Sequence, residues 1–385
     1  MDYSTFPLRH FFLKKLRGLR FVSHSSERYS AQSVFYQDRG ITAVHVCITD
    51  IEVATKHFLF HSQALTIMAE CYEEVPYSAC DDEIPTVDYS LLFSDNPNQQ
   101  LDALQRLRHA CLEYGFFYLV NHSIKDEVLD NMLKGVSDFF NQTTLDERKI
   151  YSKRSPLDKI RWGLNSYTGE NREYLKVVAH PEHHFPSKPS GFSKTLEEYG
   201  KDMRRVVIGL ARAVSKTLGF EEQFIEKALE LKSGFDVMAM NLYPPNAKSK
   251  GAVGLSEHTD PGFIISLVQD VNGGLQILSH KGNWINAYIP YHAILIQLGD
   301  QLEILTNGMY KSHIHRVIVG NNKVKRISVV GVHGPSLDKL ISPSTVFVDD
   351  EHPKKYREMA YKESLVVNGD DEVDVQSSLE KARLV

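Results

Sequence analysis

The sequence contains the stretch Leu255-Ser256-Glu257-His258-Thr259-Asp260-Pro261-Gly262, in which one residue separates an imidazole from a carboxylate. On a β-strand, residues i and i+2 point to the same face. His258 and Asp260 can therefore approach one metal ion side by side. Taken singly, each has a plainer interpretation, as a core histidine and as an aspartate that caps the following turn. A third ligand has to come from elsewhere in the chain.

A second stretch offers that ligand. Lys311-Ser312-His313-Ile314-His315-Arg316-Val317 contains two histidines, of which His315 is the best candidate. Two histidines and one carboxylate on one side of an ion form the facial triad of non-haem Fe(II) oxygenases, which leaves positions open for oxygen and an organic co-substrate. Further on, Arg326-Ile327-Ser328 brings a guanidinium and a hydroxyl to one strand face, a pair that suits a carboxylate.

The order of these motifs resembles the plant-type Fe(II)/2-oxoglutarate-dependent dioxygenases, the isopenicillin N synthase-like family. Two further segments resemble the family's motifs, residues 241–245 (Asn-Leu-Tyr-Pro-Pro) and residues 114–122 (Tyr-Gly-Phe-Phe-Tyr-Leu-Val-Asn-His). The similarity extends from about Ile84 to about Val367, which is most of the chain. It implies Fe(II) as the metal, 2-oxoglutarate as the co-substrate and O2 as the oxidant. The expected reaction is hydroxylation, desaturation or demethylation of a small organic metabolite, with release of succinate and carbon dioxide.

The resemblance also implies roles for individual residues. His258, Asp260 and His315 would be the metal ligands and the catalytic centre, and His315 is preferred over His313 because Arg-Val follows the family's ligand. The far carboxylate of 2-oxoglutarate would bind Arg326 and Ser328. The residues expected to help hold the co-substrate are Tyr243 and Asn241, and those expected near the substrate are Trp162, Asn165 and Tyr167.

Composition limits the partners and the compartment. The 385 residues carry a net charge of −5 without a long run of one sign, which argues against a nucleic-acid partner. No run of 18 apolar residues occurs, so we expect no transmembrane helix. The four cysteines are scattered and fit a reducing compartment. We therefore expect a cytoplasmic protein without a nucleic-acid or membrane partner. The resemblance implies a small-molecule substrate, and we expect the protein to be a monomer.

The chain is expected to have four parts. Residues 1–67 form a poorly ordered or accessory extension, although residues 1–26 contain five basic residues and one acidic residue, a composition that would also suit an organelle transit peptide. Residues 68–195 form an N-terminal region of helices and strands, residues 196–350 the core with its packing helix, and residues 351–385 peripheral C-terminal helices.

Many short apolar runs at even spacing predict a mainly β protein with a double-sheet jelly roll and flanking helices. The resemblance implies the same core, a double-stranded β-helix with helices packed outside. Residues 156–193 are expected to be irregular. Helices are predicted near residues 98–111, 128–139, 196–218, 221–232, 351–362 and 377–382. Strands are predicted at residues 116–120, 237–243, 263–268, 275–278, 284–287, 293–298, 315–319 and 326–332.

Two other functions remain open at this stage. One is an Fe(II) oxidase of the same fold that does not use 2-oxoglutarate, since such relatives also keep an Arg-x-Ser pair. The other is a small-molecule binding protein that has lost its chemistry, which an intact triad argues against. Counting succinate per product distinguishes the oxidase from a 2-oxoglutarate-dependent dioxygenase. Measuring oxygen uptake distinguishes the binding protein from an enzyme.

Overall fold

The computed structural model of the chain describes residues 20–21, 34–35, 83–165, 172–245, 253–319, 323–367 and 378–384. The chain divides into two compact units, residues 1–78 and residues 79–385. In the first unit, β1 (Arg20–Phe21) pairs antiparallel with β2 (Val34–Phe35). Apart from these four residues, the extension expected at residues 1–67 lies outside the described part of the chain, and the proposed four-part division stays a prediction.

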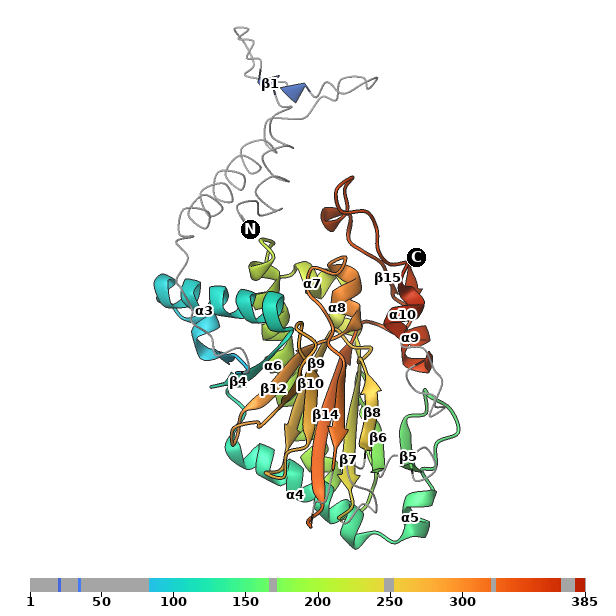
Figure 1. The fold of residues 1–385 in the computed structure, drawn as a ribbon. Helices are drawn as coiled ribbons and strands as arrows, with labels where there is room; N and C mark the ends of the chain where they lie inside the picture. The colour runs from blue at the N-terminus through green and yellow to red at the C-terminus, as the bar shows by residue number, and fades with distance from the viewer. Residues whose placement is uncertain are drawn as a thin grey trace, which may run out of the picture. The chain divides into compact units, whose positions relative to one another are not determined.

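The second unit is organised around a sheet of eight strands (Figure 1). Only β3 and β4 pair in parallel, and every other neighbouring pair is antiparallel. In spatial order the strands are β3 (Thr86–Asp88), β4 (Phe116–Val120), β12 (Ile294–Leu298), β9 (Ile264–Gln269), β14 (Arg326–Gly334), β7 (Phe235–Tyr243), β6 (Arg172–His180) and β5 (Ile160–Asn165).

A smaller sheet faces one side of the large sheet. Its strands, in spatial order, are β11 (Trp284–Asn286), β10 (Leu275–Leu278), β13 (His315–Ile318) and β8 (Val253–His258). One buried cluster joins side chains of both sheets, including Phe116, Leu267 and Leu295 from the large sheet and Ile277 and Val317 from the small one. The two sheets therefore enclose a common interior, which is the arrangement of a jelly roll.

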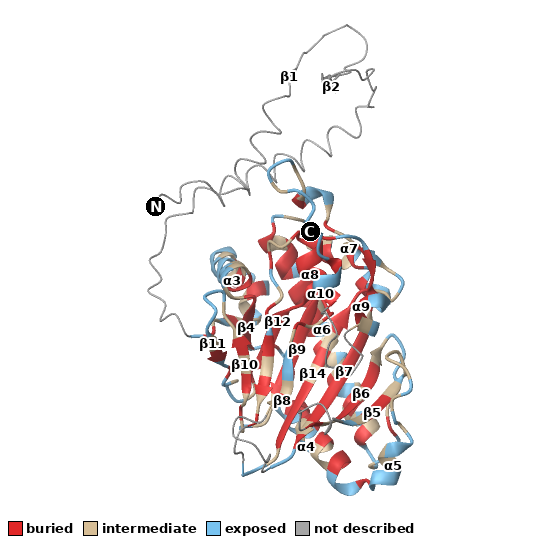
Figure 2. Ribbon diagram, turned by 45° about the vertical axis from the view of Figure 1, so that its right-hand side comes forward, coloured by how far each residue is buried: buried red, intermediate tan, exposed pale blue. Residues whose placement is uncertain are grey.

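Helices cover the opposite face of the large sheet (Figures 1 and 2). The 26-residue α6 buries a stripe of apolar residues at helical spacing, and these pack with Met238, Met240 and Ile296 of the sheet. The α-helices are α3 (Pro97–His109), α4 (Asp126–Gln142), α5 (Leu145–Lys149), α6 (Phe192–Thr217), α7 (Phe224–Ala228), α8 (Asp300–Leu305), α9 (Tyr361–Val367) and α10 (Ser378–Ala382). The remaining short elements are η1 (Ser90–Phe93), the π-helix η2 (Ala110–Tyr114), η3 (Leu231–Ser233), η4 (Thr345–Phe347), β15 (Leu340–Ile341) and β16 (Met359–Ala360).

The prediction of a mainly β protein with helices packed outside is confirmed, but residues 156–193 are not irregular throughout. They contain β5 and β6, and β6 pairs with β7 along almost its whole length. Alternation is obscured in β6 because both of its faces are largely buried, so apolar residues occur on each. Pairing with β7, which is distant in sequence, decides that this segment is a strand.

The C-terminal prediction is also partly wrong. Residues 351–360 are not helical, and α9 begins only at Tyr361. The predicted helix at residues 377–382 is present as α10. One element near the predicted metal ligands was missed, the short helix α8. The strand β8, on which His258 and Asp260 were expected together, ends at His258. α8 has only six residues, too few for a periodic pattern to be recognised.

Candidate metal and co-substrate site

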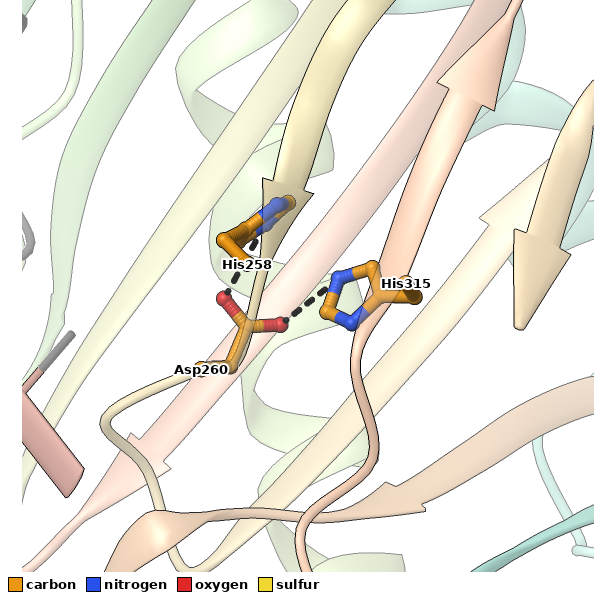
Figure 3. Close-up of side chains that lie close together, drawn as sticks. All are labelled: His258, Asp260 and His315. Carbon is orange, nitrogen blue, oxygen red and sulfur yellow. Dashed lines mark ion pairs between the residues drawn. The ribbon is translucent and has the colours of Figure 1, made fainter. Parts of the chain in front are cut away.

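His258, Asp260 and His315 meet at one end of the small sheet (Figure 3). His258 is the last residue of β8 and His315 the first of β13, and the two are direct register partners. Asp260 lies two residues beyond β8, so it reaches the histidines from a turn and not, as expected, from the strand itself. Its Oδ1 lies 3.8 Å from His258 Nε2 and its Oδ2 lies 3.4 Å from His315 Nε2.

Backbone carbonyls orient both imidazoles. Nδ1 of His258 lies 2.7 Å from the carbonyl oxygen of Ser256, and Nδ1 of His315 lies 3.3 Å from that of His313. A carbonyl only accepts, so each Nδ1 carries the hydrogen and each Nε2 keeps a lone pair directed at the common centre. Burial, together with the neighbouring His315, lowers the pKa of His258 to about 4. The ring is therefore neutral near pH 7, as a metal ligand must be.

The turn that carries Asp260 is clamped by the start of α8. The amide of Asp300 donates to the carbonyl oxygen of Asp260 at 2.9 Å, and the amide of Gln301 donates to that of Gly262 at 3.0 Å. Gly299 allows this approach, since a Cβ there would lie 2.2 Å from the Gly262 oxygen. The Asp300 side chain accepts from Thr259, between the two ligands, and burial raises the pKa of Asp300 to about 7. Gly299 and Asp300 are adjacent in the sequence, but the sequence does not reveal that they lie against the turn that carries Asp260.

The donor set fits a divalent iron. Two neutral imidazole nitrogens and one carboxylate oxygen lie within 4.8 Å of one another, and in the described part of the chain this is the one group of its kind. His313 does not join it. Its ring packs against Phe116 and over Gly115, where a Cβ would lie 2.3 Å from the ring. Nδ1 of His313 bonds the carbonyl of Leu278 at 3.0 Å.

The four predicted co-substrate residues form two cross-strand pairs on β14 and β7. Arg326 is opposite Tyr243, and Ser328 is opposite Asn241. The Arg326 guanidinium lies 4.7 Å from the centre of the Tyr243 ring, and its Nη1 lies 3.4 Å from the Ser328 hydroxyl. The sequence analysis missed Gln269, whose Oε1 accepts from Arg326 Nη2 at 2.6 Å. Gln269 lies on β9, opposite Ser328, so only strand pairing reveals it.

Arg326 is fully buried, with an exposed fraction of 0%. Its Nε donates to the carbonyl of Gly273, and two further N–H groups donate to Gln269 and Ser328. A guanidinium has five N–H groups, and three of them have an acceptor among the described residues. Two N–H groups therefore remain for a ligand. Two parallel N–H groups are what a carboxylate binds bidentately.

The residues expected near the substrate are placed differently. Trp162 packs in the outer core on the helix-covered side of the sheet, where its Nε1 donates to Glu173 at 2.7 Å. Its predicted role is therefore wrong. The side chains of Asn165 and Tyr167 lie outside the described residues. Arg161 and Arg172 lie on the other side of the same strands, and the sequence analysis did not single them out.

The sequence matches two family models, that of the 2OG-Fe(II) oxygenase superfamily over residues 234–335 and that of the N-terminal region of non-haem dioxygenases in morphine synthesis over residues 84–191. The chain is 31% identical to 2-oxoglutarate-dependent dioxygenase 19 of Oryza sativa subsp. japonica, over 78% of this chain and 90% of that protein. It is 31% identical to 1-aminocyclopropane-1-carboxylate oxidase 1 of Malus domestica, over 69% of this chain and 84% of that protein.

A crystal structure of JOX2 in complex with 2OG, Fe and JA superimposes with a TM-score of 0.70 at 27% identity, over 78% of this chain and 89% of JOX2. The chain therefore belongs to the 2OG-Fe(II) oxygenase superfamily and has its jelly-roll core. It is an Fe(II)- and 2-oxoglutarate-dependent dioxygenase. Within the described ranges, no helix is both long and apolar enough to cross a membrane.

Proposed function

We propose that His258, Asp260 and His315 hold the catalytic iron and that Arg326, Ser328, Tyr243 and Asn241 hold 2-oxoglutarate during the oxidation of a small organic substrate. The convergence of three ligand atoms from β8, β13 and the turn between β8 and β9 carries the proposal. Iron with 2-oxoglutarate and O2 supplies the oxidising chemistry, and the protein supplies binding and orientation.

Each group of residues has a distinct task. The two carbonyl-bonded imidazoles present their Nε2 atoms to the metal without having to lose a proton. Arg326 and Ser328 fix the far carboxylate of 2-oxoglutarate, which orients its other end toward the ligands. Tyr243 has an exposed fraction of 1% and covers the guanidinium, which keeps water from this ion pair.

Replacing one metal ligand tests the proposal. We expect His315→Ala to abolish oxygen uptake and to lose Fe(II) binding, because a site with three protein ligands has no spare donor. His313→Ala is the matched control. His313 precedes His315 by two residues, but its ring contacts Gly115 and Phe116 and does not join the three proposed ligands. Near-normal turnover in His315→Ala together with inactivity in His313→Ala would show that the distal ligand is wrongly chosen.

The stoichiometry of the reaction tests the use of 2-oxoglutarate as the co-substrate. We expect one succinate for each product molecule when a metabolite panel is followed by mass spectrometry. Turnover without 2-oxoglutarate would favour an oxidase, the class named for the relative from Malus domestica. Intact Fe(II) binding without oxygen uptake on any substrate would favour a binding protein.

We further propose that the enzyme is a monomer, does not bind nucleic acid and works in the cytoplasm. The net charge of −5 supports the proposal that the enzyme does not bind nucleic acid. Light scattering measures the molecular mass in solution. A fluorescent fusion of residues 1–67 tests the compartment, and its entry into an organelle would support the transit-peptide alternative.

A further inference from the structure

The short helix α8 buries three polar side chains beside the turn that carries Asp260. Asp300, Gln301 and Glu303 have exposed fractions of 0%, 1% and 3%, although α8 has only six residues. Burying polar and charged groups costs free energy unless hydrogen bonds compensate for it. The partners of these three residues therefore show which parts of the molecule α8 holds together.

Asp300 connects the turn that carries Asp260 to the C-terminal helix α10. Its amide donates to the carbonyl oxygen of Asp260 at 2.9 Å, and its Oδ2 accepts from the hydroxyl of Thr259 at 3.3 Å. The same Oδ2 accepts from the hydroxyl of Ser378, the first residue of α10, at 2.8 Å. One carboxyl oxygen therefore holds both the residue between two proposed ligands and the start of α10.

Glu303 makes the corresponding connection for the segment that leads to His315. Its Oε2 accepts from the amide of Ser312, three residues before His315, at 2.7 Å. Its Oε1 accepts from the hydroxyl of Tyr356 at 2.5 Å and lies 3.6 Å from Nη2 of Arg383, the residue after α10. The two oxygens of this carboxylate thus hold the approach to one proposed ligand and the C-terminal region of the chain.

Gln301 repeats the arrangement between these two residues. Its amide donates to the carbonyl oxygen of Gly262 at 3.0 Å, and its side-chain Nε2 donates to the hydroxyl of Ser364 on α9 at 3.1 Å. Each buried polar residue of α8 therefore has one partner on a segment next to a proposed metal ligand and another in the C-terminal region.

We propose that α8 is a positioning element of the metal site and that residues 378–384 complete it. Asp300 and Glu303 hold the ligand-bearing segments in place without touching the metal. Groups that orient ligands in this way strengthen metal binding. Coupling between two sites is reciprocal, so a bound metal stabilises the docked α10 by the same factor. This inference rests on the proposed function and adds the residues that support its metal site.

Metal binding to the full chain tests the inference. Calorimetry under nitrogen measures the affinity for Fe(II), and the visible absorption of bound Co(II) reports the coordination geometry. We expect Glu303→Gln to weaken Fe(II) binding about 10- to 100-fold, the usual effect of losing a group that orients a ligand, and to change the shape of the Co(II) spectrum. Ser378→Ala should weaken Fe(II) binding about 2- to 10-fold, because one neutral hydrogen bond is lost.

Ser215→Ala is the matched control. Ser215 has an exposed fraction of 0%, as Ser378 does, and its hydroxyl donates to the carbonyl oxygen of Ala211 at 2.8 Å. That hydroxyl also accepts from the amide of Ile225, so its two partners lie on α6 and α7 and not on a segment that carries a proposed ligand. We expect both serine variants to lower the melting temperature and only Ser378→Ala to weaken Fe(II) binding.

Hydrogen exchange in the wild-type chain tests the reciprocal effect. The amides of Arg383 and Leu384 donate to the carbonyl oxygens of Leu379 and Lys355, so their exchange reports whether the C-terminal segment is docked. Fe(II) should slow both amides by at least the factor by which Ser378→Ala weakens Fe(II) binding. The amide of Leu229, which follows α7, is the control and should keep its rate.

Each part of the inference has its own contrary result. An unchanged Fe(II) affinity in Glu303→Gln would overturn the role of α8, and an unchanged affinity in Ser378→Ala, or unchanged exchange at Arg383 and Leu384, would overturn that of residues 378–384. Should Glu303→Gln fail to fold, Ser378→Ala decides both points, since it acts through Asp300.

A general effect of stability would also be recognised. Equal losses of Fe(II) affinity in Ser215→Ala and Ser378→Ala would mean that the fold as a whole, and not the contacts of α8, controls metal binding, which would overturn the inference. Failure of the proposed function is distinguishable, since the wild-type chain would then not bind Fe(II), or His315→Ala would bind it as tightly as the wild type.

Discussion

At the scale of single residues, the buried guanidinium of Arg326 shows how one side chain can serve both fold and function. Gln269 and the Gly273 carbonyl hold it in position, and Tyr243 covers it. A charge without solvent access is tolerated only when its hydrogen bonds are satisfied. Three of the five N–H groups bond to described residues, and we propose that the other two bind the far carboxylate of 2-oxoglutarate.

We predict that Arg326→Gln raises the KM for 2-oxoglutarate about 100-fold or more. A charge-assisted hydrogen bond contributes about 1.5–3 kcal/mol, and a bidentate pair away from water reaches the upper end of that range. With about 1.4 kcal/mol for each tenfold, this corresponds to two powers of ten. Steady-state turnover at varied 2-oxoglutarate measures the effect.

Two further variants calibrate this result. Arg326→Lys should be intermediate, because an ammonium keeps the attraction but loses the fork. Ser328→Ala should cost about 0.5–1.5 kcal/mol, as expected for one neutral hydrogen bond. Fe(II) affinity should stay near the wild-type value in all three variants. An unchanged KM in Arg326→Gln would refute the assignment.

At the scale of secondary-structure elements, a buried polar network fastens α6 to the large sheet. Asp236 of β7 bonds Arg204 of α6 at 2.6 Å and His333 of β14 at 3.1 Å, and Ser266 of β9 lies 3.1 Å from the other nitrogen of that ring. Burial alone would raise the pKa of Asp236, but His333 and Arg204 outweigh it and lower this pKa to about 2. Four elements therefore depend on one carboxylate.

We predict that Arg204→Leu lowers the free energy of unfolding by about 3 kcal/mol, because it removes one partner of a buried charge. Arg205→Gln, the adjacent exposed arginine, should change it by less than about 1 kcal/mol. Urea denaturation measures both. Equal effects would mean that the Arg204 pair contributes no more than a surface ion pair.

The same network gives a pH dependence with a defined sign. The folded-state pKa of Asp236 is about 2, below the unfolded value of about 3.9. The unfolded chain therefore binds more protons in this interval, and stability is lost as the pH falls from about 4 toward 2. Arg204→Leu should flatten this part of the curve of unfolding free energy against pH. A curve parallel to that of the wild type would contradict the assignment.

At the scale of the whole molecule, the two facing sheets and their outer helices belong to the unit formed by residues 79–385. Both family models also match only residues within that unit. We predict that deletion of residues 1–67 leaves the melting temperature, Fe(II) binding and turnover within error of the full chain. Calorimetry and oxygen uptake measure these quantities, and a large loss of stability would place the boundary elsewhere.

Local sequence was sufficient to predict much of this protein. The two-residue spacings in His258-x-Asp260 and Arg326-x-Ser328 require no knowledge of distant contacts, because side-chain direction on extended backbone follows from the chain itself. The long apolar stripe of α6 and the short apolar runs of β7, β9, β12 and β14 are likewise local patterns, and they predicted helices outside a mainly β core.

Tertiary structure decided everything that depends on which strands are neighbours. β6 is a strand because β7 pairs with it, the clamp on Asp260 exists because α8 begins beside it, and Gln269 reaches Arg326 from an adjacent strand. The placement of Arg161 and Arg172 on the inward face of the large sheet follows from register across the sheet. A sequence fixes the alternation of side chains along one strand, but only the hydrogen-bonded pairing of distant strands fixes which of them share an interior.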